Sequence, residues 1–231
     1  MPTILAIETS AEVASAALLH DGTLIADEAA GVATHSQTIL PMAQSLLAKA
    51  GIRLQDCDGI AFGSGPGSFT GVRTACGIAQ GLAYGAQLPL LPVVTLLAMA
   101  AHCRERTGAD DVLAVLDARM GEVYWAQYRF DGAWQATVAP TLSTPAAVAP
   151  VGLVAACGNG LAAYMDAFAF LGPARCGMDM LPHAEQIARL GEQAFLRGEG
   201  LAAREAEPLY LRNKVALTTS ERIEKAAREA V

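Results

Sequence analysis

Hydrophobic and polar positions along the first 106 residues predict an α/β unit. Apolar runs at 3–8, 13–19 and 23–30 are typical of strands. Asp21-Gly22, between the last two runs, indicates a type I′ hairpin turn, in which both positions need a positive φ. Alternating helices and strands follow, expected at 36–50, 59–64, 70–86, 90–94 and 95–106, with Thr95 as a possible helix cap.

The second half of the chain repeats this order. A second Asp-Gly pair, at 131–132, lies 110 residues after the first, and Glu8 and Asp117 each end the first strand of their half. The elements expected in this half lie at 111–118, 122–130, 133–139, 145–149, 153–157 and 161–168. A repeat of nearly half the chain predicts duplicated domains that face each other across a cleft. The order strand-strand-strand-helix-strand-helix, occurring twice, is typical of an actin-like or sugar-kinase-like fold.

Composition narrows the class of protein. Of the 231 residues, 53% are hydrophobic and 17% are charged, which excludes global disorder. The net charge of −7 and a pI near 5.1 are the opposite of the basic surface that neutralises phosphates. We therefore expect that this chain does not hold nucleic acid alone.

The cysteines and the N-terminal sequence indicate the cellular compartment in which the protein is expected. Five cysteines without a Cys-x-x-Cys pair argue against a disulfide framework or a structural zinc site. Glu8 comes too early for a signal peptide, and the charge-free stretch 74–103 is interrupted by glutamine, proline and glycine. We expect a cytoplasmic protein that does not enter the membrane.

Charge is sparse over 31–103, where five charged residues occur in 73 positions. Helices so poor in charge are covered either by the rest of this chain or by another chain, and we favour another chain. Gly77, Gly81 and Gly85 lie on one helix face, where they admit either a neighbouring helix or this chain's own sheet. The predicted partner surface consists of Ile39, Ala43, Leu46, Leu47, Arg73, Gly77, Gly81 and Gly85.

A glycine-rich segment, 63–73, connects a predicted strand to a helix. Its glycines and the helix N-terminus suit either a phosphate cradle or a tight turn that permits close packing, and both interpretations stay open. The segment is neither a Walker A loop nor a dinucleotide fingerprint. We predict no cofactor; if a nucleotide does bind, the candidates are Gly65, Gly67, Ser68, Gly158 and Gly160.

Glu8 and Asp117 would point into the cleft of a duplicated fold. In a kinase of this architecture such acids hold a metal or activate a nucleophile, but a hydrogen-bonded acid at a strand end is the interpretation we favour. The four histidines form no pair four residues apart, which predicts no metal site. Ser10 and Ser68 have no recognisable base partner, so we predict no catalytic residue.

Four segments together resemble the TsaB family, formerly called YeaZ. They are Ile-Glu-Thr-Ser at 7–10, Gly-Pro-Gly-Ser-Phe-Thr-Gly-Val-Arg at 65–73, Asp-Ala-Arg-Met-Gly-Glu-Val-Tyr at 117–124 and Pro-Leu-Tyr-Leu-Arg at 208–212. Their order and spacing agree with that family over the full chain, and the nine-residue glycine-rich segment is the most specific of them.

The resemblance implies an α/β fold of two ribonuclease-H-like (actin-like, ASKHA) domains with mixed sheets flanked by helices. We place the domains at 1–106 and 107–231, and leave open whether the end of the chain packs back on the first. The implied role is that of a non-catalytic dimerisation subunit beside the catalytic paralogue TsaD and the small ATPase TsaE. Their complex transfers a threonylcarbamoyl group to N6 of the adenosine next to the anticodon, in tRNAs that read codons starting with A. A homodimer is expected where TsaD is absent, and tRNA contact only through the complex.

Two sequence features distinguish this chain from the catalytic paralogue. TsaD-type proteins carry two metal-binding histidines four apart, and by rough alignment this chain has Thr95 and Met99 there. The nucleotide-binding glycine run of the paralogue is reduced to Gly158-Asn159-Gly160. The alternatives are an ATP-dependent small-molecule kinase of the same fold and, far behind it, a glycoprotein endopeptidase.

Overall fold

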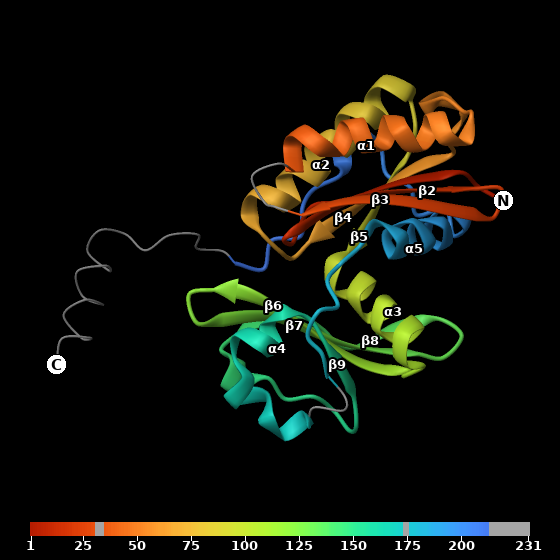
Figure 1. Ribbon diagram of the computed structural model, residues 1–231. Coiled ribbons are helices and arrows are strands. Elements are labelled where there is room, and N and C mark those ends of the chain that lie inside the picture. Colours follow the sequence, from red (N-terminus) through yellow and green to blue (C-terminus); the bar gives the residue numbers. More distant parts are fainter. Residues whose placement is uncertain (31–34, 173–175, 213–231) are drawn as a thin grey trace, which may run out of the picture.

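The computed structural model describes residues 1–30, 35–172 and 176–212, and its strands form two sheets of one topology (Figure 1). The first sheet contains β1 (Ile4–Glu8), β2 (Val13–His20), β3 (Thr23–Ala30), β4 (Gly59–Gly65) and β5 (Leu90–Val94). The second contains β6 (Asp111–Arg119), β7 (Glu122–Phe130), β8 (Trp134–Ser143), β9 (Ala155–Cys157) and β10 (Cys176–Gly177). The strand orders are β3-β2-β1-β4-β5 and β8-β7-β6-β9-β10. In both sheets the first three strands pair antiparallel and the last two join in parallel, so the predicted duplication and fold class are confirmed.

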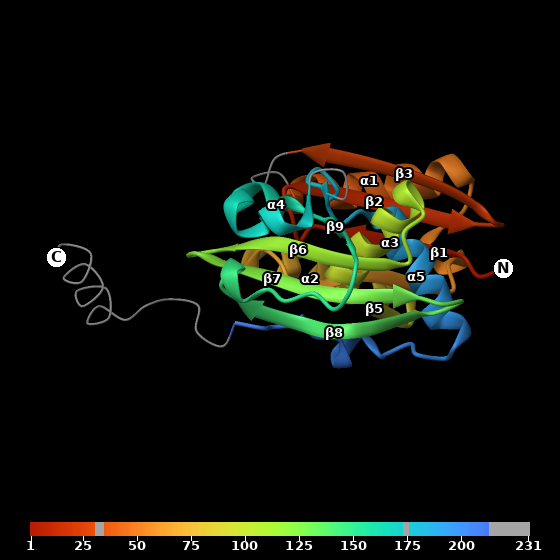
Figure 2. The ribbon, with the colours of Figure 1, turned by 90° about the horizontal axis from the view of Figure 1, so that it is seen from below.

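Helices cover both faces of the first sheet (Figure 1). One face carries α1 (His35–Ala50) and α2 (Phe69–Ala86), and the other carries α5 (Ala184–Leu196). The third helix, α3 (Thr95–Thr107), contacts strands of both sheets and so joins the two halves. Figure 2 views the molecule from the side of the second sheet, with β6, β7 and β8 in front. None of the helices in the described part of the chain is long and apolar enough to cross a bilayer.

The chain end returns to the first sheet after the second is complete. Helix α5 contacts β1, β2 and β4, and its side chains share a hydrophobic cluster with that sheet. The division of the chain at 106/107 stays a prediction. Residues 213–231, which we assigned to the second domain, lie outside the described residues.

Short 3-10 helices replace part of the helix predicted in the second half. The segment expected at 161–168 starts earlier as α4 (Asn159–Ala163), and after Tyr164 it continues as η4 (Met165–Leu171). Tyr164 has φ −135° and ψ 46°, which are not helical values, so α4 ends before it. The 3-10 helix η4, which is more tightly wound than an α-helix, begins after it. Three other short turns are η2 (Leu54–Asp56), η3 (Pro145–Ala147), where a helix over 145–149 was expected, and η6 (Ala203–Glu205).

The two Asp-Gly pairs form different turns. Asp21 and Gly22 have φ of 48° and 75°, which confirms the type I′ hairpin. In the second half only the glycine of the pair, Gly132, has a positive φ, and Phe130 pairs with Trp134 across a three-residue loop. The sheets are duplicated, but this hairpin connection is not.

Candidate functional site

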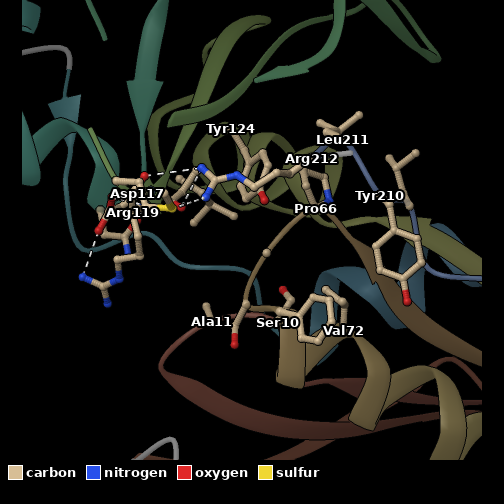
Figure 3. A pocket seen from close by; sticks show the side chains of 18 of the residues that line it. Ser10, Ala11, Pro66, Val72, Asp117, Arg119, Tyr124, Tyr210, Leu211 and Arg212 are labelled. Carbon is tan, nitrogen blue, oxygen red and sulfur yellow. Dashed lines mark hydrogen bonds and ion pairs between the residues drawn. The ribbon is translucent and has the colours of Figure 1, made fainter. Parts of the chain in front are cut away.

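A pocket of about 350 Å³ lies between the two sheets, beside the ends of β1 and β6 (Figure 3). This is the position at which the internal repeat predicted a cleft. Its wall comes from residues 10–12, the glycine-rich loop and start of α2 between 66 and 72, the β6–β7 hairpin at 116–120, the C-terminal residues 209–212, and Tyr124 and Asn159.

The glycine-rich loop packs tightly against the backbone that follows β1. A Cβ on Gly67 would lie 2.6 Å from the carbonyl oxygen of Ser10, and a Cβ on Gly71 would overlap the carbonyl oxygen of Thr9. The N–H of Ser68 donates to the Ser10 carbonyl oxygen over 2.8 Å, and the Ser68 hydroxyl caps α2 by accepting from the Gly71 N–H. These contacts favour a strand-to-helix turn whose glycines permit packing over a cradle that reserves its N–H groups for a phosphate.

Gly158 and Gly160 are confined in the same way. A Cβ on Gly158, whose φ is +111°, would overlap the carbonyl oxygen of Val115. A Cβ on Gly160 would lie 2.7 Å from Cγ1 of the same valine. Between them, the side-chain oxygen of Asn159 accepts a hydrogen bond from the N–H of Asp117 over 3.0 Å. This short glycine run therefore holds α4 against β6.

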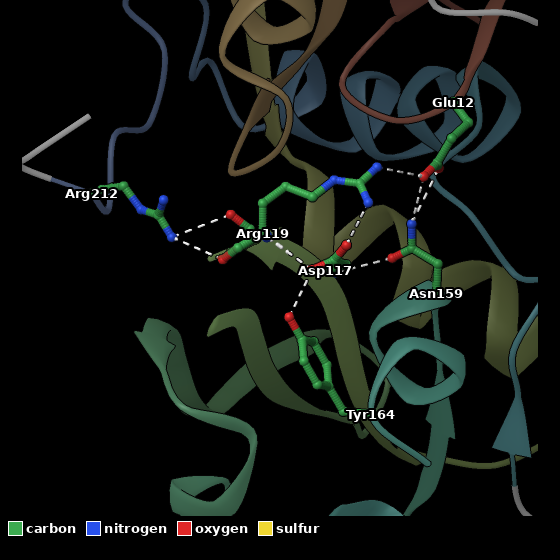
Figure 4. A network of polar contacts seen from close by, with 7 residues as sticks. Glu12, Asp117, Arg119, Asn159, Tyr164 and Arg212 are labelled. Carbon is green, nitrogen blue, oxygen red and sulfur yellow. Dashed lines mark hydrogen bonds and ion pairs between the residues drawn. The ribbon is translucent and has the colours of Figure 1, made fainter. Parts of the chain in front are cut away.

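Asp117 lines the pocket and belongs to a polar network that links the two halves (Figure 4). Its carboxylate lies 2.9 Å from the Arg119 guanidinium and also accepts from the Tyr164 hydroxyl over 3.3 Å. The side-chain amide of Asn159 donates to both carboxylate oxygens of Glu12, at 2.9 and 3.2 Å, and Arg119 reaches the same carboxylate at 3.9 Å. The Asp117 carboxylate is thus held by two neighbouring side chains, one of them charged.

Glu8 does not open into the pocket, contrary to the prediction from the repeat. Its side chain is fully buried and lies against Gly63 on the neighbouring strand, where any Cβ would overlap the carboxylate. The carboxylate accepts from the N–H of Ser10, while its Oε2 atom has no hydrogen-bond partner among the described residues. Burial raises the pKa of Glu8, against the opposing effect of hydrogen bonds from Ser10 and Thr9.

Thr95 and Met99, which stand where the resemblance implies the histidine pair of the paralogue, are both fully buried. The Thr95 hydroxyl oxygen accepts from the N–H of Gly65 at 3.1 Å and from the hydroxyl of Ser10 at 3.3 Å. Thr95 is therefore not the cap of α3, since the N-cap is Val94, which makes no side-chain capping bond. Within the described ranges, no three His, Cys, Asp or Glu side chains come together as a possible metal site.

The structure corrects the predicted partner surface on α1. Ile39, Ala43 and Leu46 face the sheet with 0%, 3% and 0% of their surface exposed, because the apolar stripe of α1 packs on its own sheet. Leu47 is half-buried beside them. The outward residues of α1 are Ser36, Gln37, Leu40, Pro41, Gln44, Ala48 and Lys49.

On α2 the glycine stripe faces outward. Gly77, Gly81 and Gly85 are exposed, and a Cβ built on any of them would meet nothing within 4 Å in the part of the chain that the structure describes. The stripe therefore does not serve packing on this chain's own sheet, which was the open alternative. Tyr84, next to it, is 83% exposed, and Arg73 is exposed nearer the start of the helix. We call the outward residues of α1 together with Arg73, Gly77, Gly81, Tyr84 and Gly85 the α1–α2 surface.

Three residues of the pocket and its network were not found from the sequence: Glu12, Tyr164 and Arg212. Glu12 and its partner Asn159 are 147 residues apart, so no local pattern pairs them. Arg212 belongs to a segment that carried the family resemblance, but nothing in that motif indicated what its side chain contacts.

Two domains of this topology, facing each other across a pocket, define a two-domain protein of the actin-like fold class. The family model described as "TsaD: tRNA N6-adenosine threonylcarbamoyltransferase" matches residues 26–216 of the chain.

Curated relatives narrow the assignment. The tRNA threonylcarbamoyladenosine biosynthesis protein TsaB of Escherichia coli K12 is 44% identical over 221 residues, covering 92% of this chain and 96% of the relative. TsaB of Haemophilus influenzae is 40% identical over 226 residues, covering 92% and 94%. A solved structure of YeaZ from Pseudomonas aeruginosa superimposes with a TM-score of 0.83 at 40% identity, covering 91% of this chain and 100% of that one. The chain belongs to the TsaB (YeaZ) family.

Proposed function

We propose that this protein is a non-catalytic dimerisation subunit of the complex that transfers a threonylcarbamoyl group to tRNA. The group would go to N6 of the adenosine next to the anticodon, in tRNAs that read codons beginning with A. The transfer would take place on a TsaD-type partner, with TsaE as a third component and tRNA held through the complex, in the cytoplasm. The names of the relatives, which refer to tRNA threonylcarbamoyladenosine biosynthesis, support the pathway.

The α1–α2 surface is the observation that carries the proposal. The only acidic or basic residues in the two helices, apart from a histidine, are Lys49 and Arg73. The outward glycines of α2 leave its backbone uncovered, so another helix can approach at a short interaxial distance. A face with few charges and no side chain along its centre suits a helical partner better than water. The equivalent helices of a TsaD-type paralogue, built on the same fold, provide such a partner.

The pocket supports the non-catalytic part of the proposal. Glu8 is enclosed, Asp117 is paired with Arg119, and the positions of the paralogue's histidine pair hold Thr95 and Met99 inside the core. None of these side chains is placed to activate a nucleophile or to receive a metal ion from solvent.

The same surface would join two copies of this chain where TsaD is absent. Such a dimer is isologous, with each copy offering the same face. Because both contacts would use one surface, TsaD should replace the homodimer rather than add to it. Sedimentation of the isolated chain at micromolar concentration, repeated with TsaD added, tests this; one molecule that holds both contacts at once would contradict it.

Substitution of Gly81 by leucine tests the surface directly. Among the described residues the leucine side chain has open space, and it favours the helix over glycine by roughly 0.5–1 kcal/mol, so the variant should melt no lower than the parent at concentrations where both are monomeric. Against a partner helix it is overpacked, at a cost of about 1–3 kcal/mol, so affinity for TsaD should fall roughly 5- to 150-fold.

Gln193→Leu is the matched control, since Gln193 is an exposed helical residue of α5, on the opposite face of the same sheet. Calorimetry should show weaker TsaD binding for Gly81→Leu and unchanged binding for the control. Equal affinities of a folded Gly81→Leu and the control would show that the surface is assigned wrongly.

A further inference from the structure

The C-terminal part of the described chain runs along α2 and then crosses to the second sheet. The side-chain amide of Gln80 on α2 donates to the carbonyl oxygens of Ala203 and Ala206, both at 3.0 Å. The N–H of Leu209 then donates to the carbonyl oxygen of Ser64, at the end of β4, over 2.7 Å. We call residues 206–212 the strap. Its first part is fixed to the first sheet and α2 by main-chain contacts.

The far end of the strap is held by one side chain. The Arg212 guanidinium donates to the carbonyl oxygens of Ala118 and Arg119, at 3.2 and 3.4 Å, and pairs with the Glu122 carboxylate at 2.5 Å. The Arg212 side chain is 15% exposed, whereas that of Arg119 beside it is 76% exposed. Among the described residues, every hydrogen bond from the strap to the second sheet begins at Arg212.

The β6–β7 hairpin that receives Arg212 has an unusual backbone. Arg119, Met120 and Gly121 have φ of 62°, 58° and 78°, and a left-handed conformation at a non-glycine residue costs roughly 1–2 kcal/mol. The two carbonyl oxygens next to this turn are the ones that Arg212 binds, so the bound guanidinium stabilises the turn. Figure 4 shows that Arg212 approaches the hairpin from one side while Glu12 lies on the other, beyond the Arg119 guanidinium.

The strap also forms one wall of the pocket. Residues 209–212 line it together with Pro66, Val72 and the hairpin (Figure 3). The Tyr210 ring lies 4.7 Å from the guanidinium carbon of Arg73, which itself stacks at 3.3 Å on the Phe69 ring. Displacing the strap would therefore remove a wall of the pocket and leave the hairpin without the donor that fixes its turn.

The anchor is weak enough to open. The Glu122 side chain is 35% exposed, and an ion pair with this much solvent contact is screened and contributes little net free energy. The Nε atom of Arg212 is buried without a hydrogen-bond partner among the described residues. The free-energy cost of removing this N–H from water offsets part of the stabilisation that the other hydrogen bonds of Arg212 provide. Segments with few such contacts open locally long before the protein unfolds.

We infer that residues 206–212 are a releasable strap, anchored by Arg212 at Glu122 and the β6–β7 hairpin, whose release opens the pocket between the domains. The inference concerns the isolated chain and goes beyond the proposed role in a complex. A partner that bound Glu122 or the strap would change both the access to the pocket and the conformation of residues 117–122.

Trypsin measures the release of the strap, because it must extract the Arg212 side chain before it can cut there. Cleavage after Arg204, whose side chain is 87% exposed, is the internal reference. Glu122→Gln removes the charge that holds Arg212 and keeps the size of the side chain. We expect cleavage after Arg212 to accelerate about two- to fivefold relative to cleavage after Arg204, as mass spectrometry of the products would show. Glu199→Gln, which breaks the exposed ion pair with Arg197, is the matched control and should leave the ratio unchanged.

Thiol labelling measures whether the pocket opens with the strap. Ala118 lines the pocket and is 8% exposed, so a cysteine there reports access from solvent, after subtraction of the labelling of the parent chain. In the Ala118→Cys background, Glu122→Gln should label about two- to fivefold faster, and Arg212→Met, which also removes the bonds to the two carbonyl oxygens, should label at least as fast as Glu122→Gln. Glu199→Gln should not label faster, and thermal melts should confirm that all variants are folded. Rapid cleavage after Arg212 in the parent chain, or release of the strap without faster labelling, would overturn the inference.

Discussion

Helix α2 has one buried and one exposed face, and its glycines differ accordingly. At Gly71 a Cβ would overlap the carbonyl oxygen of Thr9, whereas at Gly77, Gly81 and Gly85 a Cβ would meet no atom of the described residues within 4 Å. The inner glycine is required by this chain's own packing. The outer three glycines lower the helix propensity, and no contact within the described part of the chain compensates for this. Their position supports our proposal that they serve a contact with another molecule.

The largest effect is expected from Gly71→Ala. The new methyl group has no room beside the backbone of the turn after β1, so the loop or the helix must shift, and the free energy of unfolding should fall by about 3 kcal/mol. Denaturant unfolding of the isolated chain measures this loss.

Gly77→Ala, six residues further along the same helix, is the control for that substitution. Its methyl group points into open space, so the free energy of unfolding should rise by about 0.5–1 kcal/mol. If both alanines changed stability by the same amount and sign, helix propensity alone would explain them, and the distinction between inner and outer glycines would fail.

A smaller effect, dependent on pH, is expected where Glu8 lies against the inner glycine Gly63. Because burial raises the pKa of Glu8, the folded protein binds this proton more tightly than the unfolded chain does. The stabilisation of the folded state by this tighter proton binding is fully present below the unfolded pKa of about 4.3. It is lost as pH rises through the pKa that Glu8 has in the folded protein. The free energy of unfolding should therefore fall with rising pH, by at most about 1.4 kcal/mol per pH unit from this group.

Glu8→Gln keeps the shape of the side chain and removes the titration. Urea unfolding of both proteins between pH 5 and 8 should show a smaller fall for the glutamine variant. Parallel pH profiles for the two proteins would be evidence against an enclosed, titrating Glu8.

No effect on chemistry is expected from Asp117→Asn, although Asp117 lines the pocket. Since its carboxylate is held by Arg119 and Tyr164, the substitution should alter transfer only as far as it alters folding or assembly. Transfer to tRNA by a reconstituted complex of this chain with TsaD, TsaE and threonylcarbamoyl-adenylate measures this. Lost transfer in a complex that still assembles would show that this subunit takes part in the reaction. ATP turnover by the isolated chain that depends on Asp117 would identify a small-molecule kinase instead.

Local sequence patterns were sufficient to predict most of the helices and strands and the internal repeat. Alternating apolar runs and helical spacing depend on neighbours in the chain, so β3, β5 and β7 lie at the predicted residues and α1 and α2 begin within one residue of prediction. Helix α5 and strand β10 were not predicted, and the prediction for α4 and η4 was inaccurate. Both α4 and η4 are short; α4 is held by contacts with β6, and η4 contacts η3 and α4.

The side chains around the pocket could be predicted less well, because their environment is made by residues far apart in the sequence. The repeat placed Glu8 and Asp117 at equivalent strand ends, but Gly63 on the neighbouring strand gives Glu8 an enclosed site, while Asp117 faces the pocket. Helical spacing likewise identified the apolar residues of α1 without showing that Ile39 and Leu46 face the chain's own sheet.

By itself the sequence determined most of the elements, though not α5 or β10, together with their duplicated order, the sparse charge of the first two helices and the family motifs, all of which depend on residue type and spacing. The tertiary structure decided which glycines are enclosed and which are open, and it joined Glu12 to Asn159 and Arg212 to Glu122. Those contacts span 147 and 90 residues. Pairs so distant in sequence meet only when the two sheets and the returning chain end are in place, since no local preference brings them together.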